Sequence, residues 1–260
     1  DVGAKLVSSD INLLWFTGST KAGEEIYAKC GQKFIKGLME MGGSSAGIIF
    51  ADADLESAVE NIYLSRFSAA GQVCNAVKRM FVERSVFDKV VSLLKTRLEK
   101  TTIGNPLENL DFGPISYSAQ LKKLEQQVND SVKMGAKVET GGKRPNDLKL
   151  AKGNYYEPTL LTNISFEMPV MKEEIFGPIL PVMPFETEEQ VIDLANNTIW
   201  GLGNEVYTKD LEKGNRVAKQ LESGVVGINT FDYFRASCPF GGYKKSGIGR
   251  ADGELGYQSF

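Results

Sequence analysis

The chain has 260 residues, of which 42% are hydrophobic and 24% charged, and its net charge is −3. This length predicts one or two domains with a buried core. The balanced charge argues against a strongly basic nucleic-acid-binding protein, and no apolar run approaches the roughly 18 residues of a transmembrane helix. We therefore expect neither nucleic acid nor a membrane as a partner.

The chain contains no histidine. A Ser-His-Asp triad, a Cys-His pair and a His-ligated zinc site are therefore excluded within it. Proton transfer must fall to a carboxylate, a lysine, a tyrosine or water. The cysteines Cys30, Cys74 and Cys238 form no Cys-x-x-Cys pair, so we expect no zinc site or disulfide framework. Their odd number suits a reducing cytoplasm, and cytoplasmic is the predicted location.

Apolar and polar blocks alternate along the chain in the lengths typical of α/β proteins. Strands are predicted at 11–17 (a buried one), 38–41, 46–50, 81–82, near 138, and at 158–161, 179–185, 205–207 and 225–229. Helices are predicted at 21–30, 54–69 with Asp54 as N-cap, 85–99, 117–135, 188–196 and 211–222. A loop is expected at 101–114 and an irregular, Gly-rich tail from 239.

Cys74 follows a predicted helix in the segment Gly71-Gln72-Val73-Cys74. A loop flanked by glycine can expose a thiol and direct backbone N–H groups at it, which favours a lowered thiol pKa and an oxyanion hole. The alternative is a buried structural cysteine, the commoner fate of an isolated thiol. Spacing alone does not decide between the two.

Glu40 lies in an otherwise apolar stretch that ends at Gly42-Gly43. A carboxylate there is either desolvated, with a raised pKa, or paired with a cation. Desolvation would make it a useful base in a chain without histidine. The alternative is a glutamate at the end of a strand that points to solvent.

Two further segments have features of a nucleotide site. Gly18-Ser19-Thr20 joins a predicted strand to a helix, whose first N–H groups suit a phosphate, although many such turns bind nothing. In the segment 173–178, Glu174 can accept hydrogen bonds from ribose hydroxyls and Phe176 can lie against a flat ring, although composition alone favours a simple turn.

Some patterns are interpreted as structural. The segment Gly43-Ser44-Ser45-Ala46-Gly47 matches a nucleophile elbow, but without histidine it is interpreted as a backbone turn. Lys244, Lys245 and Arg250 are interpreted as solvated surface charges.

Taken together, and in their order along the chain, these segments resemble the aldehyde dehydrogenase superfamily. The resemblance rests on 16–20 with Gly23, on Glu40-x-Gly-Gly, on Gly71-Gln-Val-Cys74, on Gly104-Asn-Pro, on Glu173-Glu-Ile-Phe-Gly-Pro and on 239–247. It implies an α/β fold: an aldehyde dehydrogenase catalytic domain with an open sheet, and the edge of a Rossmann-like cofactor domain.

The resemblance also implies roles. Cys74 is expected to be the nucleophile and Glu40 the base that activates water to hydrolyse a thioester. Gly18, Ser19, Glu174 and Phe176 are expected to contact the cofactor, NAD or NADP, with NAD slightly favoured. Phe234 and Phe240 fall where the family lines its substrate tunnel, and Arg235 could pair with a substrate carboxylate or be a surface residue; no metal is expected.

Domain boundaries follow from the same resemblance. Residues 1–41 are expected to be the remnant of the dinucleotide-binding domain, 42–245 the catalytic domain, and 246–260 a segment leading to an oligomerisation strand. An N-terminal half of the family chain is absent, so we expect the isolated 260 residues to be inactive and the full-length protein to be a homodimer or homotetramer.

The substrate is expected to be a small aldehyde. Residues 224–247 resemble succinate-semialdehyde dehydrogenases, whereas 71–75 also suit lactaldehyde dehydrogenases. A CoA-acylating relative typically lacks the glutamate at position 40. From another class, the chain could be a non-catalytic fragment that acts as a binding or assembly module.

Overall fold

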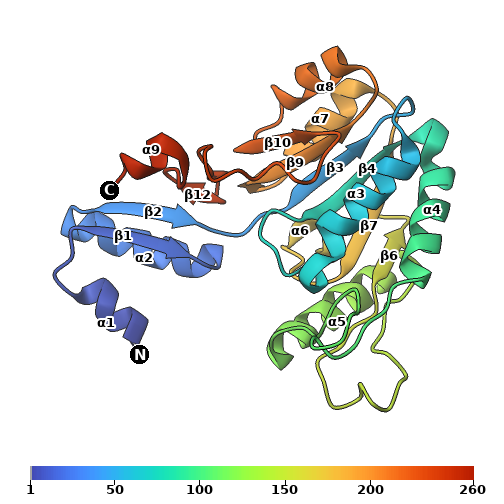
Figure 1. Ribbon diagram of the computed structural model, residues 1–260, viewed down its shortest axis with the longest axis horizontal. Helices are drawn as coiled ribbons and strands as arrows, with labels where there is room; N and C mark the ends of the chain where they lie inside the picture. Colours follow the sequence, from blue (N-terminus) through green and yellow to red (C-terminus); the bar gives the residue numbers. More distant parts are fainter. Residues whose placement is uncertain (1) are drawn as a thin grey trace.

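The computed structural model describes residues 2–260 and consists of a small lobe, formed by both ends of the chain, and a large lobe (Figure 1). The small lobe holds a three-stranded sheet in the order β1 (Leu13–Thr17), β2 (Lys36–Glu40), β12 (Gly247–Ile248). β1 is parallel to β2, and β12 is antiparallel to it. Helix α2 (Thr20–Lys33) connects β1 to β2, and short helices α1 (Val2–Ser8) and α9 (Gly253–Tyr257) flank them.

The large lobe is built on a seven-stranded sheet in the order β10-β9-β3-β4-β7-β6-β5. All neighbouring strands in it are parallel except β5 and β6. Its strands are β3 (Ser45–Ile49), β4 (Val77–Glu83), β5 (Lys137–Thr140), β6 (Thr159–Thr162), β7 (Ile179–Phe185), β9 (Gly203–Tyr207) and β10 (Val225–Ile228). This is the open α/β sheet that was predicted.

Helices pack against this sheet (Figure 1). They are α3 (Leu55–Phe67), α4 (Phe87–Glu99), α5 (Ser118–Lys133), α6 (Pro169–Lys172), α7 (Glu188–Asn196) and α8 (Leu211–Ala218), with 3₁₀ turns at Ser68–Gly71 and Arg84–Val86. Asp54 caps α3 as predicted, since its carboxylate accepts a hydrogen bond from the Ser57 N–H at 3.2 Å.

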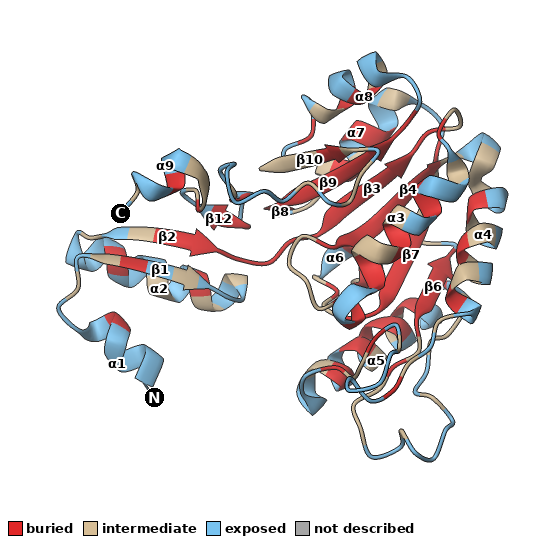
Figure 2. Cartoon of the chain, in the orientation of Figure 1, coloured by how far each residue is buried: buried red, intermediate tan, exposed pale blue. Residues whose placement is uncertain are grey.

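The main hydrophobic core is formed by the large sheet and the helices that cover it, and the central strands of the sheet are buried (Figure 2). Every residue of β3 is buried, the pattern expected of a parallel strand covered by helices. A second, smaller cluster stabilises the small lobe, and Cys30, Met39 and Met41 belong to it. Each lobe therefore has its own apolar centre, and the chain crosses between them at 41–44 and again near 246.

Several predicted elements were wrong in detail. β1 was expected to be buried, but it is an edge strand in which Trp15 is half exposed. The Trp15 ring lies tilted against the Phe260 ring, with ring centres 5.5 Å apart. The helix predicted to Ala69 ends at Phe67, because Ala69 and Ala70 both take left-handed backbone angles. The tail is not irregular: besides β12 and α9 it contains β11 (Tyr243–Lys244), which pairs with β8 (Trp200–Gly201).

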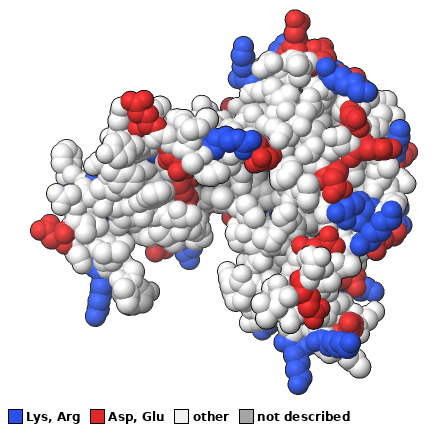
Figure 3. Space-filling model, in the orientation of Figure 1, with Lys and Arg blue, Asp and Glu red and all other residues white. Residues whose placement is uncertain are grey.

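Acidic and basic side chains are intermixed over the face drawn in Figure 3, which is hollowed between the two lobes. No helix within residues 2–260 is long and apolar enough to cross a membrane. Within the same range, no three His, Cys, Asp or Glu side chains are grouped as metal ligands.

Candidate active site

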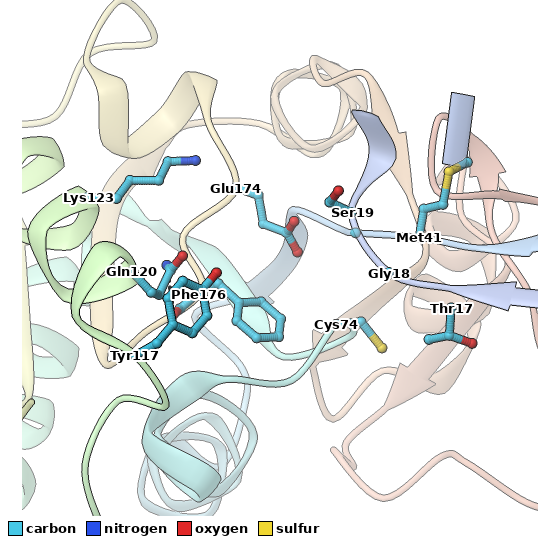
Figure 4. Close-up of a pocket in the computed structure, with 11 residues that line it drawn as sticks. Thr17, Gly18, Ser19, Met41, Cys74, Tyr117, Gln120, Lys123, Glu174 and Phe176 are labelled. Atoms are coloured by element: carbon cyan, nitrogen blue, oxygen red, sulfur yellow. Dashed lines mark hydrogen bonds between the residues drawn. The ribbon is translucent and has the colours of Figure 1, made fainter. Parts of the chain in front are cut away.

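A cavity of about 500 Å³ lies between the two lobes (Figure 4). The small lobe and the crossing segment line it with Thr17, Gly18, Ser19, Met41 and Gly42, and the large lobe with Cys74, Tyr117, Gln120, Lys123, Glu174 and Phe176. Five of the residues singled out in the sequence thus meet at one place: Gly18, Ser19, Cys74, Glu174 and Phe176.

The backbone before Cys74 explains how the thiol reaches the cavity. Ala69, Ala70 and Gly71 are successive residues with positive φ angles of 51°, 55° and 70°, which turn the chain sharply out of α3. A side chain at Gly71 would overlap the Gly177 carbonyl group. Glycine is therefore required where the nucleophile loop passes the 174–178 loop closely. Cys74 is half-buried on the cavity wall, which argues against a structural core cysteine.

The environment of the Cys74 thiol differs from the expectation in one respect. Burial raises the pKa of the thiol above its usual value, and the charges of Glu40 and Glu174 act in the same direction. The Lys78 ammonium and a backbone hydrogen bond from Asn75 oppose this rise. The expected lowering of the pKa is therefore wrong for this state of the site, because desolvation outweighs the nearby cation.

Glu40 is the last residue of β2 and is only 7% exposed. Neither carboxylate oxygen has a hydrogen-bond partner. Burial raises the pKa of Glu40 to about 7, the Arg250 guanidinium opposes the shift, and Asp252 adds to it. Of the alternatives drawn from the sequence, the desolvated carboxylate is the one observed, and a base with a pKa near neutrality suits proton abstraction.

Arg250 was interpreted as a solvated surface charge, and this was wrong. It is half-buried, donates to the carbonyl groups of Gly242 and Gly249 at 3.2 and 2.7 Å, and its charge acts on Glu40. The neighbouring Lys244 and Lys245 are exposed, as expected. The interpretation of 43–47 as a turn was also wrong, because this segment runs directly into the buried strand β3.

The start of α2 opens onto the cavity. Ser19 caps the helix, since its hydroxyl accepts a hydrogen bond from the Ala22 N–H at 3.3 Å. The Gly18 N–H donates to the Glu40 carbonyl at 3.0 Å, so the turn is held against the end of β2. The first N–H groups of a helix lack partners within it and attract anions, so the geometry of this turn suits a phosphate group.

Glu174 faces this turn from the large lobe. Its Oε1 atom accepts hydrogen bonds from the Gly43 N–H at 3.0 Å and from the Lys78 ammonium at 2.9 Å. A Cβ atom on Gly42 would overlap the Glu174 carboxylate, which explains the glycine there. A helix start, a carboxylate with a free oxygen and the Phe176 ring on one cavity fit the phosphate, ribose and flat base of a nicotinamide cofactor.

The predicted substrate residues lie outside the lining of this cavity. Phe234 and Phe240 pack edge to face with ring centres 5.3 Å apart. Arg235 is exposed and paired with Asp232 at 2.9 Å. The structure therefore brings the two phenylalanines together but leaves Arg235 on the surface, and their role in binding substrate stays a prediction.

Sequence reasoning missed three groups around Cys74. Lys78, completely buried, donates to the Cys74 carbonyl at 2.6 Å. Tyr233 exchanges hydrogen bonds with Asn75, at 3.3 Å from the Asn75 amide and at 3.2 Å to its carbonyl. Arg66 donates to the carbonyl groups of Ile175, Gly177 and Ile179. The available signal was a lysine and an arginine inside apolar segments, where charges need specific partners.

The model of the aldehyde dehydrogenase family matches residues 1–260. The chain belongs to this family, and the expectation drawn from its motifs is confirmed. It is 41% identical to a betaine aldehyde dehydrogenase of Bacillus subtilis over all of this chain and 53% of that protein. It is 40% identical to a glutarate-semialdehyde dehydrogenase of Pseudomonas aeruginosa, again over all of this chain and 53% of the other.

Solved structures of aldehyde dehydrogenases share this fold. The fold matches a crystal structure of betaine aldehyde dehydrogenase from Staphylococcus aureus in complex with NAD⁺, with a TM-score of 0.97 and 37% identity, over all of this chain and 52% of that one. It also matches lactaldehyde dehydrogenase from Escherichia coli, with a TM-score of 0.93 and 38% identity, over 98% of this chain and 53% of that one. The chain thus spans about half the length of the relatives it matches.

Proposed function

We propose that this chain forms the catalytic half of an NAD(P)-dependent aldehyde dehydrogenase, which oxidises an aldehyde to a carboxylic acid through Cys74. The observation that carries the proposal is the single cavity that joins Cys74 to the start of α2, to Glu174 and to Phe176. The buried carboxylate of Glu40, with a pKa of about 7, supplies the base that the second half of the reaction needs.

In the first half-reaction, the Cys74 thiolate attacks the aldehyde carbon. A carbon–sulfur bond forms, and the carbonyl electron pair moves onto oxygen, where the Cys74 N–H can stabilise it. Collapse of this oxyanion restores the C=O bond as hydride leaves the carbon, and a thioester on Cys74 remains. Covalent catalysis thereby splits one difficult oxidation into two easier steps.

In the second half-reaction, Glu40 removes a proton from water. The resulting hydroxide adds to the thioester carbon, the carbon–sulfur bond breaks, and the carboxylic acid leaves while Cys74 returns to the thiolate. A CoA-acylating enzyme would not need this base, so the presence of Glu40 supports the hydrolytic reaction.

The nicotinamide cofactor supplies the hydride acceptor when bound. The chain's own contribution is to hold it: Gly18 and Ser19 at the phosphates, Glu174 at a ribose, and Phe176 beside the ring. NAD is favoured because the similar Staphylococcus aureus structure is described as an NAD⁺ complex. NADP is the alternative cofactor.

The substrate is proposed to be a small aldehyde, with succinate semialdehyde as the first candidate. The glutarate-semialdehyde dehydrogenase relative supports an aldehyde that carries a carboxylate at its other end. Arg235 could pair with that carboxylate if its bond to Asp232 opens. The lactaldehyde dehydrogenase structure and the motif at 71–75 support lactaldehyde as the alternative.

The test is a pair of cysteine variants. Cys74→Ala should abolish aldehyde oxidation by the complete natural protein, because no thioester can form. Cys238→Ala is the matched control: this cysteine is also free but exposed, and its loss should leave the rate unchanged. Substantial oxidation by the Cys74→Ala protein contradicts the proposal.

The half-length match leads to a second expectation. We propose that residues 1–41 belong to a dinucleotide-binding domain, 42–245 to the catalytic domain and 246–260 to a segment leading to subunit contacts, and that the complete protein is a cytoplasmic homodimer or homotetramer. The isolated 260 residues should then show no appreciable NAD-dependent oxidation and could act only as a binding or assembly module. Robust turnover by the purified fragment contradicts this.

A further inference from the structure

Lys78 is a buried cation to which the proposed mechanism gives no task. It lies near the start of β4, four residues after Cys74, and its side chain is 1% exposed. Removing an ammonium group from water is expensive unless charged or polar partners replace the lost hydration. The groups that it contacts must therefore explain its presence.

Those groups belong to two different parts of the site. The Lys78 Nζ atom donates to the Cys74 carbonyl oxygen at 2.6 Å and to Glu174 Oε1 at 2.9 Å. One ammonium group thus bridges the backbone of the nucleophile and the carboxylate proposed to hold the cofactor ribose. A lysine that only filled space in the core would not need hydrogen bonds to both the Cys74 backbone and the Glu174 side chain.

The Glu174 carboxylate, at the start of the 174–178 loop, has few hydrogen-bond partners besides Lys78. Glu174 Oε1 also accepts from the Gly43 N–H at 3.0 Å, while Arg66 holds the backbone carbonyl groups further along the loop. Lys78 is therefore the cation in direct contact with the Glu174 side chain, and the backbone of the loop is fixed independently of it.

The same two charges act on the thiol in opposite directions. The Lys78 ammonium lowers the pKa of Cys74, whereas the Glu174 carboxylate raises it. Burial lowers the pKa of Lys78 below its usual value, and the charge of Glu174 opposes this lowering. Loss of Lys78 and loss of Glu174 should therefore shift the pKa of the Cys74 thiol in opposite directions.

We propose that Lys78 is a positioning residue that couples the nucleophile to the cofactor site, by holding the Cys74 backbone and the Glu174 carboxylate through one ammonium group. The inference rests on the proposed function. It requires that Lys78 and Glu174 affect thiol ionisation in opposite directions while both support cofactor binding. A purely structural role would change both properties through misfolding, in the same direction for either variant.

The experiment uses the complete natural protein with Cys238 replaced by alanine, and iodoacetamide labelling is followed by mass spectrometry of the peptide that contains Cys74, so that cysteines elsewhere, including the buried Cys30, do not contribute. The variants are Lys78→Met, Lys78→Arg, Glu174→Gln and the double variant of Lys78→Met with Glu174→Gln. The control is Lys89→Met, an exposed lysine on α4. The readouts are the alkylation rate of Cys74 against pH and the affinity for NAD⁺ by calorimetry.

Lys78→Met should slow alkylation at neutral pH several-fold and weaken NAD⁺ binding about tenfold or more, the usual effect of losing a charge-assisted hydrogen bond. Glu174→Gln should speed alkylation but also weaken binding. Lys78→Arg keeps the charge and should restore much of both properties. In the double variant, Lys78→Met should add little further loss of affinity, because its effect passes through Glu174.

The proposal is overturned if Lys78→Met behaves like Lys89→Met, or if Lys78→Met and Glu174→Gln move the alkylation rate in the same direction. If Lys78→Met does not fold, an unchanged alkylation rate in Glu174→Gln overturns it equally. Alkylation requires neither aldehyde nor turnover. A protein that shows the opposite shifts but oxidises no aldehyde therefore contradicts the proposed function and supports the coupling.

Discussion

Ser246 is completely buried, and its hydroxyl donates a 2.7 Å hydrogen bond to the Gly42 carbonyl, where the chain crosses from the small lobe to the large one. The same hydroxyl oxygen accepts a 3.0 Å hydrogen bond from the Gly201 N–H. The Met41 N–H donates to the Ser246 carbonyl at 2.8 Å. One serine in the tail therefore ties together the crossing segment, β8 and the end of β2.

Replacing Ser246 with alanine should destabilise the protein by about 1–3 kcal/mol, because a buried carbonyl and a buried N–H both lose their partner. Catalysis should be affected less than stability, since Ser246 does not line the cavity. Denaturant unfolding measures the change, with the exposed Ser116→Ala as the comparison. Equal midpoints for the two variants would contradict this role.

Glu40→Gln should slow the hydrolytic half of the reaction more than the first hydride transfer. A glutamine keeps the shape of the side chain but cannot take a proton from water, and general-base catalysis contributes about 10²–10⁴-fold. Rapid mixing should show a retained burst of NADH followed by a much slower steady rate. An equal loss in both phases would argue against Glu40 as the base.

The pH dependence of hydrolysis follows from the same residue. The base must be ionised, and burial raises the pKa of Glu40 to about 7. The hydrolysis rate should therefore rise with pH up to about 7 and level off above it. Arg250→Gln removes the cation that opposes this shift and should move the rise to higher pH. A profile in Arg250→Gln that coincides with the unmodified protein would exclude this electrostatic link.

The sequence predicted the parts of the site that depend on local chemistry. A cysteine shortly after Gly71, the helix start after Gly18, and an acidic and an aromatic residue before a Gly-Pro break all line one cavity, while their roles stay predictions. Most strands and helices of the large lobe were also predicted in their order along the chain, because hydrophobic periodicity is a local signal; the short helix α6 and the two-residue strand β8 were missed. Family motifs linked these local features into one site.

The charge interactions between residues far apart in the chain could not be predicted from local sequence patterns. Lys78 contacts Glu174, 96 residues away, and Arg250 affects Glu40 across more than twice that separation in the chain. Pattern reasoning sees only neighbours in sequence, so it placed Arg250 on the surface and expected a lowered thiol pKa at Cys74. The burial of β1 was predicted wrongly for a related reason. Its apolar residues predict a buried strand, but its place at the edge of the sheet depends on contacts that the local sequence does not show.

Glu205 is a buried carboxylate that should make stability depend on pH. It is 1% exposed and accepts 2.6 Å hydrogen bonds from the hydroxyls of Ser65 and Tyr207. Burial nevertheless raises its pKa to about 7, against a usual value of 4.5. Between these two values the folded protein binds more protons than the unfolded chain. The free energy of unfolding should therefore fall as pH rises from 4.5 to 7 and change little above 7.

Glu205→Gln tests this dependence, because the neutral amide has a similar shape and no charge to desolvate. A shift of this size corresponds to roughly 3 kcal/mol across the interval. The variant should lose stability less steeply than the unmodified protein between pH 5 and 7, as measured by urea unfolding at each pH. Comparing the slopes removes the constant cost of a changed hydrogen bond to Tyr207. Parallel slopes for the two proteins would show that Glu205 has about the same pKa in the folded protein as in the unfolded chain, and would contradict the prediction.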